Sequence, residues 1–190
     1  MNNIKIGYAL TGSFCTFEKS LAQMQKLKEE GCDLLPIMSY NAYTFDTRFG
    51  KAREFRDRIE KISEKKIIST IVEAEPVGPK GLTDVLIVLP CTGNTLAKLA
   101  NGIYDTTVTL AVKSHLRNQR PVVIGVSSND SLSSTAKNIG LLLNTKHYYF
   151  IPMKQDDPQK KPFSVVCDFT LLSETVEAAL DGKQLQPILI

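Results

Sequence analysis

Three short stretches of the chain combine hydroxyl, amide and glycine residues, the residue types that bind small anions. They are Thr11-Gly12-Ser13, Thr92 to Thr95, and Ser127 to Asn129. Each stretch follows an apolar run that is typical of a buried strand. In a parallel sheet, the residues after the strands gather at one edge, toward which helix N-termini also point. The pattern therefore predicts a pocket that suits a phosphate or a dicarboxylate.

The first stretch has the features of a phosphate-binding turn. Gly12 lets the backbone approach an anion closely, and Thr11 and Ser13 add hydroxyl donors. A tight turn that only caps the following helix explains the same residues equally well. The turn alone leaves both interpretations open.

The turn does not carry the dinucleotide-binding fingerprint, because only Gly7 and Gly12 of its glycines are present. The second predicted strand ends in Met38-Ser39, without the carboxylate that binds the ribose of NAD. NAD is therefore disfavoured. Ser39 or Arg48 would still suit the 2′-phosphate of NADP, which stays open, whereas a mononucleotide phosphate needs fewer assumptions.

Apolar periodicity and turn residues predict which elements position these stretches. Strands are predicted at 4–8, 33–38, 66–72, 85–89, 121–126 and 148–152, and helices at 14–30, 51–63, 94–101, 105–117, 131–143 and 171–180. Asp105 is expected to cap the fourth helix, and 154–161 is expected to be a mobile surface loop. This order predicts a single α/β domain over residues 1–190, with a three-layer, flavodoxin-like or Rossmann-like parallel sheet and helices on both faces.

Composition excludes several classes of protein. The 190 residues are 43% hydrophobic and 23% charged, and no apolar run approaches the roughly 20 residues of a membrane span. A net charge of +3 is too small to indicate nucleic-acid binding, and the basic residues between Arg48 and Lys66 alternate with acidic ones, as on a solvated helix face. The start of the chain does not resemble a secretory signal, so we expect a cytoplasmic protein.

The four cysteines form no metal-binding pattern. Cys15, Cys32, Cys91 and Cys167 are dispersed, without a C-x-x-C pair or a histidine at ligand spacing. We therefore expect free thiols, and neither a metal site nor a disulfide framework.

The stretch from Leu89 to Asp105 resembles a motif of the flavoprotein family, which includes peptidyl-cysteine decarboxylases, phosphopantothenoylcysteine decarboxylase and prenyl-flavin synthases. The family motif is Pro-Ala-Ser-Ala-Asn-Thr, followed by Ala-Lys and Gly-x-x-Asp. The residues that match it are Pro90, Asn94, Thr95, Ala97, Lys98, Gly102 and Asp105. Gly7 to Ser13 is similar to the family's phosphate turn, and Ser39, Ala42 and Phe45 are spaced like its Thr-x-x-Ala-x-x-Phe.

This resemblance implies FMN as the cofactor. Ser13 and Ser39 would hold its phosphate, while Asn94 and Thr95 would face the flavin or the substrate. It also implies a homo-oligomer, such as a trimer or a dodecamer, because in this family a neighbouring protomer completes the flavin site.

The chain also departs from the decarboxylases of this family. Their catalytic histidine has no counterpart, since His115 lies in a predicted helix and His147 precedes a strand. Their Pro-x-Met-Asn substrate clamp is replaced by Val126-Ser127-Ser128-Asn129, which keeps only Asn129. Decarboxylation of a cysteine substrate is therefore disfavoured, and both histidines are expected to be ordinary packing or surface residues.

One branch of the family resembles this chain nearly from end to end, at Lys5 to Phe17, Pro90 to Thr95 and Pro121 to Asp130. It implies one component of a two-component oxidoreductase that converts a dihydropyridine dicarboxylate into pyridine-2,6-dicarboxylate. The nicotinamide-binding domain, with NADP, would be on the companion A subunit. The alternative is a non-catalytic component that keeps the flavoprotein architecture for binding and assembly.

The catalytic residue stays unassigned, with Cys91 and Asn94 as candidates. A thiol near helix N-termini can be acidified into a base or nucleophile, but a small residue that fills the turn explains Cys91 as well. Lys98 lies one helical turn beyond Asn94, either toward the same pocket or exposed on the helix.

Overall fold

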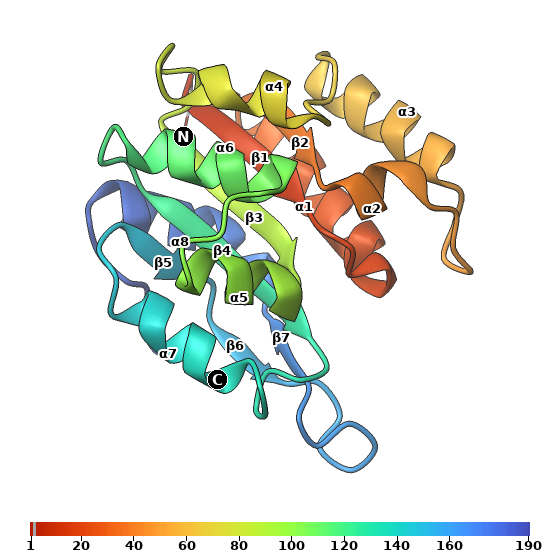
Figure 1. Cartoon of the computed structure of the whole chain (residues 1–190), viewed down its shortest axis with the longest axis vertical. Helices are drawn as coiled ribbons and strands as arrows, with labels where there is room; N and C mark the ends of the chain where they lie inside the picture. The colour runs from red at the N-terminus through yellow and green to blue at the C-terminus, as the bar shows by residue number, and fades with distance from the viewer. Residues whose placement is uncertain (2) are drawn as a thin grey trace.

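A computed structural model describes residues 1 and 3–190, which form one seven-stranded sheet with helices on both faces (Figure 1). The strands are β1 (Lys5–Leu10), β2 (Asp33–Met38), β3 (Val85–Cys91), β4 (Val122–Ser128), β5 (Tyr148–Phe150), β6 (Met153–Gln155) and β7 (Val165–Cys167). The α-helices are α1 (Phe17–Glu29), α2 (Tyr40–Thr44), α3 (Ala52–Ser63), α4 (Ile71–Ala74), α5 (Gly93–Ala100), α6 (Thr107–Leu116), α7 (Ala136–Leu143) and α8 (Leu172–Leu180).

The first five strands are parallel and lie in the order β2-β1-β3-β4-β5. This is the strand order of flavodoxin-like sheets, in which ligands bind beyond the carboxyl ends of the strands. The predicted α/β fold with helices on both faces is confirmed.

The sheet is mixed, however, because β6 and β7 form an antiparallel ribbon that the sequence did not predict. We call residues 153–167 the β6–β7 ribbon. It joins the sheet where Ser127 and Ser128 at the end of β4 pair with Val166 and Val165. The first half of β4 pairs instead with β5, so this one strand serves two neighbours. Strands of three residues are too short to show a reliable alternation of apolar and polar residues.

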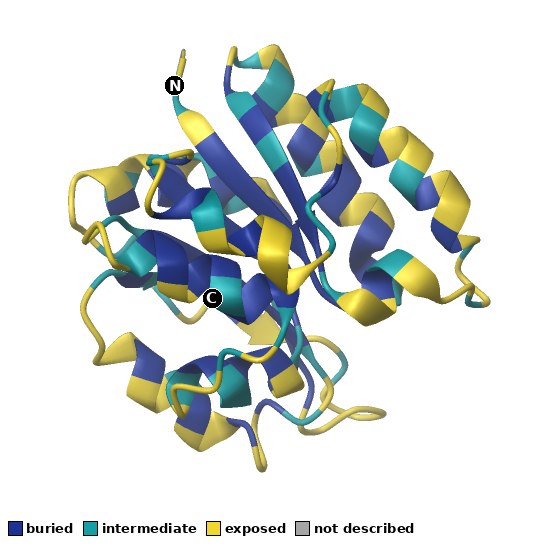
Figure 2. Ribbon diagram, turned by 45° about the horizontal axis from the view of Figure 1, so that its top comes forward, coloured by how far each residue is buried: buried dark blue, intermediate teal, exposed yellow. Residues whose placement is uncertain are grey.

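The sheet separates two hydrophobic cores. Helices α1, α3 and α8 cover one face, and α5, α6, α7 and the short helix α4 cover the other. Alternation along the strands sends Tyr8 and Ile87 to the first core and Ala9 and Val88 to the second. In Figure 2 the central strands are buried along almost their whole length, while exposed residues lie on the outer faces of the helices. This double burial explains why β3 and residues 122–126 of β4 are continuously apolar.

Several predicted elements are wrong in type or in boundary. The strand predicted at 66–72 contributes only a single bridge from Ile68 to Ile37, and a short helix follows. Thr70 accepts a hydrogen bond from the N–H of Glu73, whose carboxylate accepts one from Thr70 N–H. This capping box ends the extended segment.

The helix predicted at 131–143 begins only at Ala136, because Ser131 to Thr135 form turns whose hydroxyls bind neighbouring groups instead. The segment between β2 and α3, for which the sequence predicts no helix, contains α2, which Ser39 caps by accepting from Ala42 N–H at 3.4 Å. The surface loop predicted at 154–161 overlaps β6 and continues into the tip of the β6–β7 ribbon.

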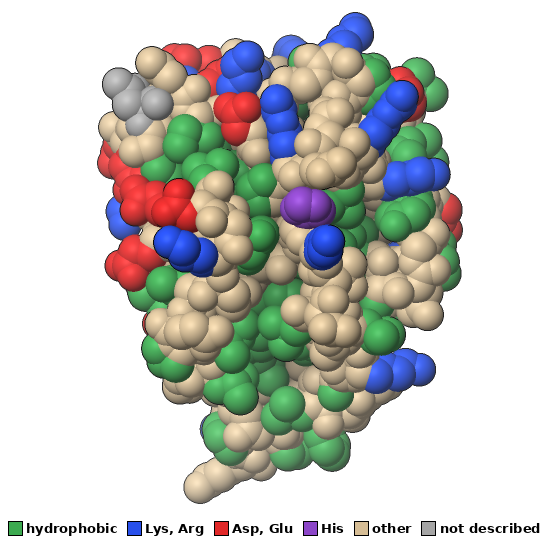
Figure 3. Space-filling model, turned by 90° about the vertical axis from the view of Figure 1, so that its left-hand side faces the viewer, with side chains coloured by type: hydrophobic (Ala, Val, Ile, Leu, Met, Phe, Trp, Pro, Cys, Tyr) green, Lys and Arg blue, Asp and Glu red, His purple; other side chains and the backbone are tan. Residues whose placement is uncertain are grey.

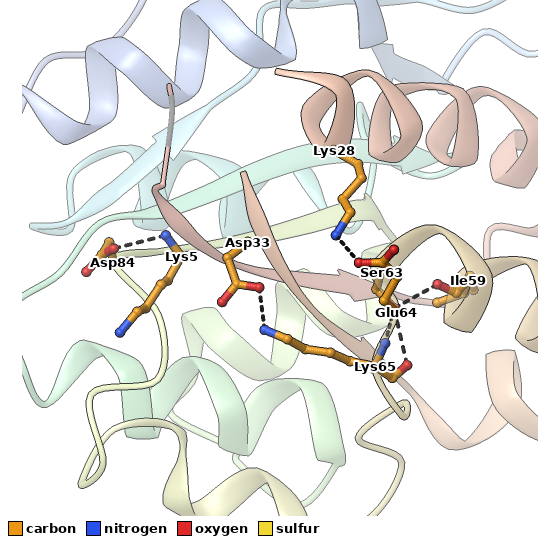
Figure 4. A network of polar contacts seen from close by, with 8 residues as sticks. All are labelled: Lys5, Lys28, Asp33, Ile59, Ser63, Glu64, Lys65 and Asp84. Carbon is orange, nitrogen blue, oxygen red and sulfur yellow. Dashed lines mark hydrogen bonds and ion pairs between the residues drawn. The ribbon is translucent and has the colours of Figure 1, made fainter. Parts of the chain in front are cut away.

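Charged residues at the amino-terminal edge of the sheet pair with one another (Figure 4). Lys65 Nζ lies 2.5 Å from Asp33 Oδ1, and Lys28 Nζ lies 2.8 Å from Glu64 Oε2. The backbone N–H of Lys5 donates to Asp84 at 3.0 Å. The ammonium groups of Lys28 and Lys65 are therefore each matched by a carboxylate.

Among the described residues, no helix is long and apolar enough to cross a membrane.

His115 is a buried packing residue, as expected. Its burial should make the free energy of unfolding depend on pH. Its Nε2 donates to the carbonyl of Pro121 at 2.9 Å, so Nδ1 accepts from the Thr83 hydroxyl at 2.8 Å. Burial lowers the pKa of His115 from 6.5 to about 4, and nearby Arg120 also lowers it. The unfolded chain therefore binds a proton that the folded chain does not, between these two values.

We expect the free energy of unfolding to be highest above pH 6.5 and to fall by roughly 3 kcal/mol as the pH drops toward 4. Denaturant titrations across this range measure it. The His115→Asn variant is the control: it starts less stable, and its loss over the same range should be smaller by that amount. Equal losses for both proteins would contradict the assignment.

Candidate functional site

A cleft of about 810 Å³ opens at the carboxyl-terminal edge of the sheet, beyond β1, β3 and β4. Six of the ten residues predicted to bind a ligand line it. They are Gly12, Ser13, Thr92, Asn94, Ser127 and Asn129. The three stretches singled out from the sequence therefore meet in one hollow, as the parallel topology requires.

The floor of the cleft is a cluster of hydroxyl groups. Ser13 Oγ lies 2.8 Å from Ser127 Oγ, which joins the turn after β1 to the end of β4. Thr16 lies within 3.4 Å of the same Ser127 oxygen and donates to the carbonyl of Ser13 at 2.9 Å. The position of Ser13 is thus fixed from two sides, and its hydroxyl can turn toward a ligand.

The N-terminus of α5 forms a second wall. Thr92 caps the helix by accepting from the N–H of Thr95 at 3.3 Å, and Ser128 Oγ accepts from the N–H of Gly93 at 3.2 Å. Among the described residues, no acceptor is paired with the N–H of Asn94, whose exposed side chain lines the cleft. The backbone and the side-chain amide of Asn94 are therefore both available to an anion.

Asp130 holds this wall in place. Its carboxylate accepts hydrogen bonds from Ser128 at 2.6 Å, Thr135 at 2.8 Å and Ser134 at 2.9 Å. Burial favours the neutral acid, but the three hydroxyl donors outweigh burial and lower the pKa of Asp130. The carboxylate is therefore ionised and fully occupied, which makes it a clamp for the loop after β4.

No sequence motif identifies the cationic and aromatic side chains that line the cleft. Lys19 and Arg48 line the cleft, as does Lys161, whose ammonium lies 2.6 Å from Asp156. The Arg48 guanidinium lies 4.8 Å above the ring of Phe49, and Phe14 and Val166 add further apolar surface. The sequence suggests Arg48 only as a partner for a 2′-phosphate. Among the other residues, Lys19 lies on α1, Val166 in β7, Phe14 in a 3₁₀ turn, and Phe49 and Lys161 in loops, and no local sequence signal marks them as site residues.

Four predicted binding residues do not line the cleft. Thr11 is buried: its hydroxyl donates to the carbonyl of Pro90 at 2.8 Å and accepts from the N–H of Thr92 at 3.0 Å. Pro90 and Thr95 are buried as well. Ser39 caps α2 at the end of β2, outside the cleft lining. Thr11, Pro90 and Thr95 support the walls of the cleft.

Cys91 does not have the environment of a reactive thiol. Its side chain is fully buried in the second core, and burial raises its pKa. The acidified thiol considered from the sequence is therefore contradicted, and the plainer alternative, a small buried residue, describes Cys91. In the described part of the chain, no three or more His, Cys, Asp or Glu side chains are grouped to hold a metal ion.

Asp105 and Lys98 pair with each other outside the cleft. Lys98 Nζ lies 2.5 Å from Asp105 Oδ1, and this hydrogen bond lowers the pKa of Asp105. The cap of α6 is Thr106, whose hydroxyl accepts from the N–H of Thr109, so the prediction that Asp105 caps this helix is wrong. Lys98 does not contribute to the anion pocket.

Comparison with known proteins identifies the family. The family model described as "Flavoprotein" matches residues 1–177. The chain belongs to the flavoprotein family. It is 45% identical to the B subunit of dipicolinate synthase from Bacillus subtilis (strain 168) over 186 residues, which cover 98% of this chain and 93% of that protein.

Solved structures agree with this assignment. The crystal structure of the dipicolinate synthase B subunit from Bacillus halodurans superposes with a TM-score of 0.91 at 44% identity and covers 100% of this chain and 98% of that one. The Burkholderia xenovorans protein DmrB, solved in complex with FMN and described as a cubic protein cage for redox transfer, gives a TM-score of 0.69 at 18% identity, over 94% of this chain and 96% of that one. The second likeness shows the fold alone.

Proposed function

We propose that this chain is the B subunit of a dipicolinate synthase, which oxidises dihydrodipicolinate to dipicolinate, pyridine-2,6-dicarboxylate, during sporulation. In this proposal NADP is held by the companion A subunit, and the complex acts in the cytoplasm. The observation that carries the proposal is the 45% identity to the B subunit of a dipicolinate synthase over nearly the whole chain. The anion cleft supports it, because the substrate bears two carboxylates.

The cleft also suits FMN, which we propose as its ligand. Its volume of about 810 Å³ lies within the range of small-molecule sites. Hydroxyls and N–H groups at Ser13, Ser127 and Asn94 suit a phosphate, and the rings of Phe14 and Phe49 offer apolar surface to a flat ring system. Ser39, outside the cleft lining, is proposed as a further phosphate partner only by family resemblance. A bound flavin would supply a two-electron acceptor.

The reaction removes a hydride and a proton from the dihydropyridine ring. In our proposal Ser13 holds the phosphate of FMN, and Asn94 and the cation of Arg48 orient the dicarboxylate. NADP⁺ on the A subunit accepts the hydride, and water accepts the proton. Asn129 and Thr92 would add polar contacts from the rim. Asn94 touches the ligand in this arrangement and remains the candidate catalytic residue.

A second candidate function is that of a non-catalytic binding and assembly component. The observation that favours it is that no free carboxylate or imidazole base is found among the described residues that line the cleft. They include no histidine, and their two carboxylates, Asp130 and Asp156, are occupied by hydroxyls and by Lys161. We also propose a homo-oligomer, such as a trimer or a dodecamer, since DmrB, which shares the fold, is described as a cage.

Dihydrodipicolinate oxidation, assayed with each of the two proteins separately and with both together, with and without FMN, tests these proposals. We expect activity only when both are present, and a visible flavin spectrum for this chain. Asn94→Ala and Ser13→Ala should each lower activity or FMN affinity about tenfold without changing the melting temperature. Glu177→Ala, exposed on α8 and outside the cleft lining, is the control.

The outcomes separate the candidates. A colourless chain that forms a complex with the A subunit but adds nothing to its activity would favour the assembly role. Release of carbon dioxide from a peptide with a C-terminal cysteine would instead indicate a relative of the FMN-dependent cysteine decarboxylases. No activity with both proteins and FMN present would refute the main proposal.

A further inference from the structure

The cleft contains a cation that has no role in the proposed function. Lys161 lies on the tip of the β6–β7 ribbon and lines the cleft, where its Nζ atom is 2.6 Å from Oδ2 of Asp156, another lining residue. Among the described residues, this is the one hydrogen bond of the Lys161 ammonium, which has three N–H donors. Two donors are therefore available to a ligand in the cleft.

Hydrogen bonds hold the backbone of the ribbon tip in place. Asp156 N–H donates to the carbonyl of Ser164 at 3.2 Å, and Lys161 N–H donates to the carbonyl of Asp157 at 2.7 Å. The ribbon itself is paired with the end of β4, which forms part of the cleft. Lys161 thus reaches the cleft from an anchored turn, so its side chain can adjust to a ligand without movement of the backbone.

Positive charge reaches the cleft from both ends of the strand order. The strands lie in the order β2-β1-β3-β4-β7-β6, and Arg48 follows β2 whereas Lys161 precedes β7. Ser13 and Asn94, which follow β1 and β3, line the cleft between them in this order. The carboxylates of pyridine-2,6-dicarboxylate point apart on either side of the ring nitrogen. The arrangement therefore suits a dicarboxylate better than a ligand with one carboxylate.

The ion pair between Lys161 and Asp156 competes only weakly with such a ligand. The two side chains are 55% and 40% exposed, and ion pairs in this much contact with water contribute little to stability. A ligand carboxylate that other donors of the cleft already hold gains a charge-assisted hydrogen bond from the same ammonium. Binding of the ligand therefore costs the protein little at this position.

Lys19, the third cation of the lining, is a less suitable partner. It lies on α1, near Asp168. The hydrogen bond from Thr170 is the main cause that lowers the pKa of Asp168, and the charges of Lys154 and Lys19 lower it further. Asp168 lies outside the cleft lining, so the Lys19 ammonium has a competing carboxylate away from the ligand.

We propose that Lys161 is a specificity-determining residue, which binds the second carboxylate of the substrate and so selects dicarboxylates over monocarboxylates. This inference rests on the proposed function for the identity of the substrate. Asn94 and Arg48 orient the other carboxylate. Asp156 positions the Lys161 ammonium through its hydrogen bond, while its negative charge limits the affinity for a dianion.

Calorimetric titration of the chain, with FMN present, with pyridine-2,6-dicarboxylate and with pyridine-2-carboxylate tests the inference. We expect the unchanged chain to prefer the dicarboxylate by about tenfold or more, and Lys161→Met to reduce this preference to about twofold or less. Lys161→Arg should keep most of the preference, because it keeps the charge. Asp156→Asn should raise the affinity for the dicarboxylate about threefold, because it keeps an acceptor for the ammonium and removes the charge that repels the ligand.

Two exposed lysines outside the cleft lining provide controls with the same loss of charge. Lys160 is the neighbour of Lys161 on the ribbon, and Lys146 lies before β5, at the amino-terminal edge of the sheet. Figure 3 shows other lysine and arginine side chains around a histidine on the left-hand side of the Figure 1 view, so positive charge is not confined to the cleft. Lys160→Met and Lys146→Met should leave the preference unchanged, which excludes a general effect of net charge.

The outcomes separate this inference from the proposed function. A preference that Lys161→Met leaves unchanged, or that Lys19→Met removes in its place, would overturn the inference, as would a lack of dicarboxylate binding by the unchanged chain. A tenfold loss of FMN affinity in Lys161→Met, measured by fluorescence quenching, would show that the ammonium binds the phosphate of FMN and would also overturn it. In each case the proposed function would stand if the chain and the A subunit together oxidised dihydrodipicolinate, and would fail if they did not.

Discussion

Replacing Ser13 by aspartate should weaken FMN binding strongly while leaving the fold intact. The Ser13 hydroxyl lies 2.8 Å from Ser127 in a partly buried floor, where a carboxylate would face the anionic group of any ligand. Repulsion between like charges in a site with limited access to water amounts to several kcal/mol. We therefore expect affinity to fall by about 100-fold or more, which is roughly 3 kcal/mol. Fluorescence quenching of FMN on titration with the protein measures the change.

Two controls make this prediction specific. Ser13→Ala removes one donor without adding charge and should cost about tenfold or less. Asn144→Asp places the same charge on an exposed position at the far end of α7 and should not affect binding. Equal affinities for Ser13→Asp and the unchanged protein, with matching melting curves, would show that the ligand phosphate does not lie at this turn.

Replacing Gly93 by valine should both destabilise the protein and disrupt the cleft. A Cβ atom at this position would lie 2.6 Å from Asp130 Oδ1 and 2.8 Å from the hydroxyl oxygens of Ser128 and Thr135. Such distances require either α5 or the loop after β4 to move, and the hydrogen bonds to Asp130 would be lost with that movement. We expect the free energy of unfolding to fall by about 3 kcal/mol. Urea denaturation measures it.

The chain contains a matched control for this substitution. Gly140 lies inside α7, and nothing within 4 Å would meet an added Cβ. Gly140→Ala should leave ligand binding unchanged and stabilise the protein by up to about 1 kcal/mol, because alanine favours the helix. If Gly93→Val were as stable as the unchanged protein, the close packing of α5 on the Asp130 clamp would be wrong.

The predictable part of the fold is the part with strong local signals. β3 and β4 are long enough and apolar enough to be recognised as buried strands, and α1 shows helical periodicity up to a clear stop at Gly31. The β6–β7 ribbon has no such signal, because its strands of three residues are defined by pairing with β4 across the sheet. At residues 66–72, β-branched residues indicated a strand, but local capping by Thr70 and Glu73 favoured a helix.

The candidate site likewise has residues that the sequence predicts and residues that it does not. Residues directly after strands, such as Ser13 and Ser127, could be placed at one edge of the sheet from topology alone. Lys19 and Lys161 could not, because they reach the cleft from a helix and from the ribbon, and only the tertiary structure brings them there. The direction of the Cys91 side chain could not be predicted for another reason. Side chains alternate between the two faces along β3, but Cys91 is the last residue of the strand, where the sequence does not show whether that alternation continues.

The pairing of β4 with two different strands, β5 and β7, affects ligand affinity. Ser127 and Ser128 belong to a strand and are tied by backbone pairing to Val166 and Val165. Residues held by a sheet lose little conformational freedom when a ligand arrives, whereas residues on a free loop must be ordered at a cost of roughly 1 kcal/mol each. The cleft is thus preorganised on its β4 side, and adaptation to ligands of different shape falls to side chains on loops, such as Arg48, Phe49 and Lys161.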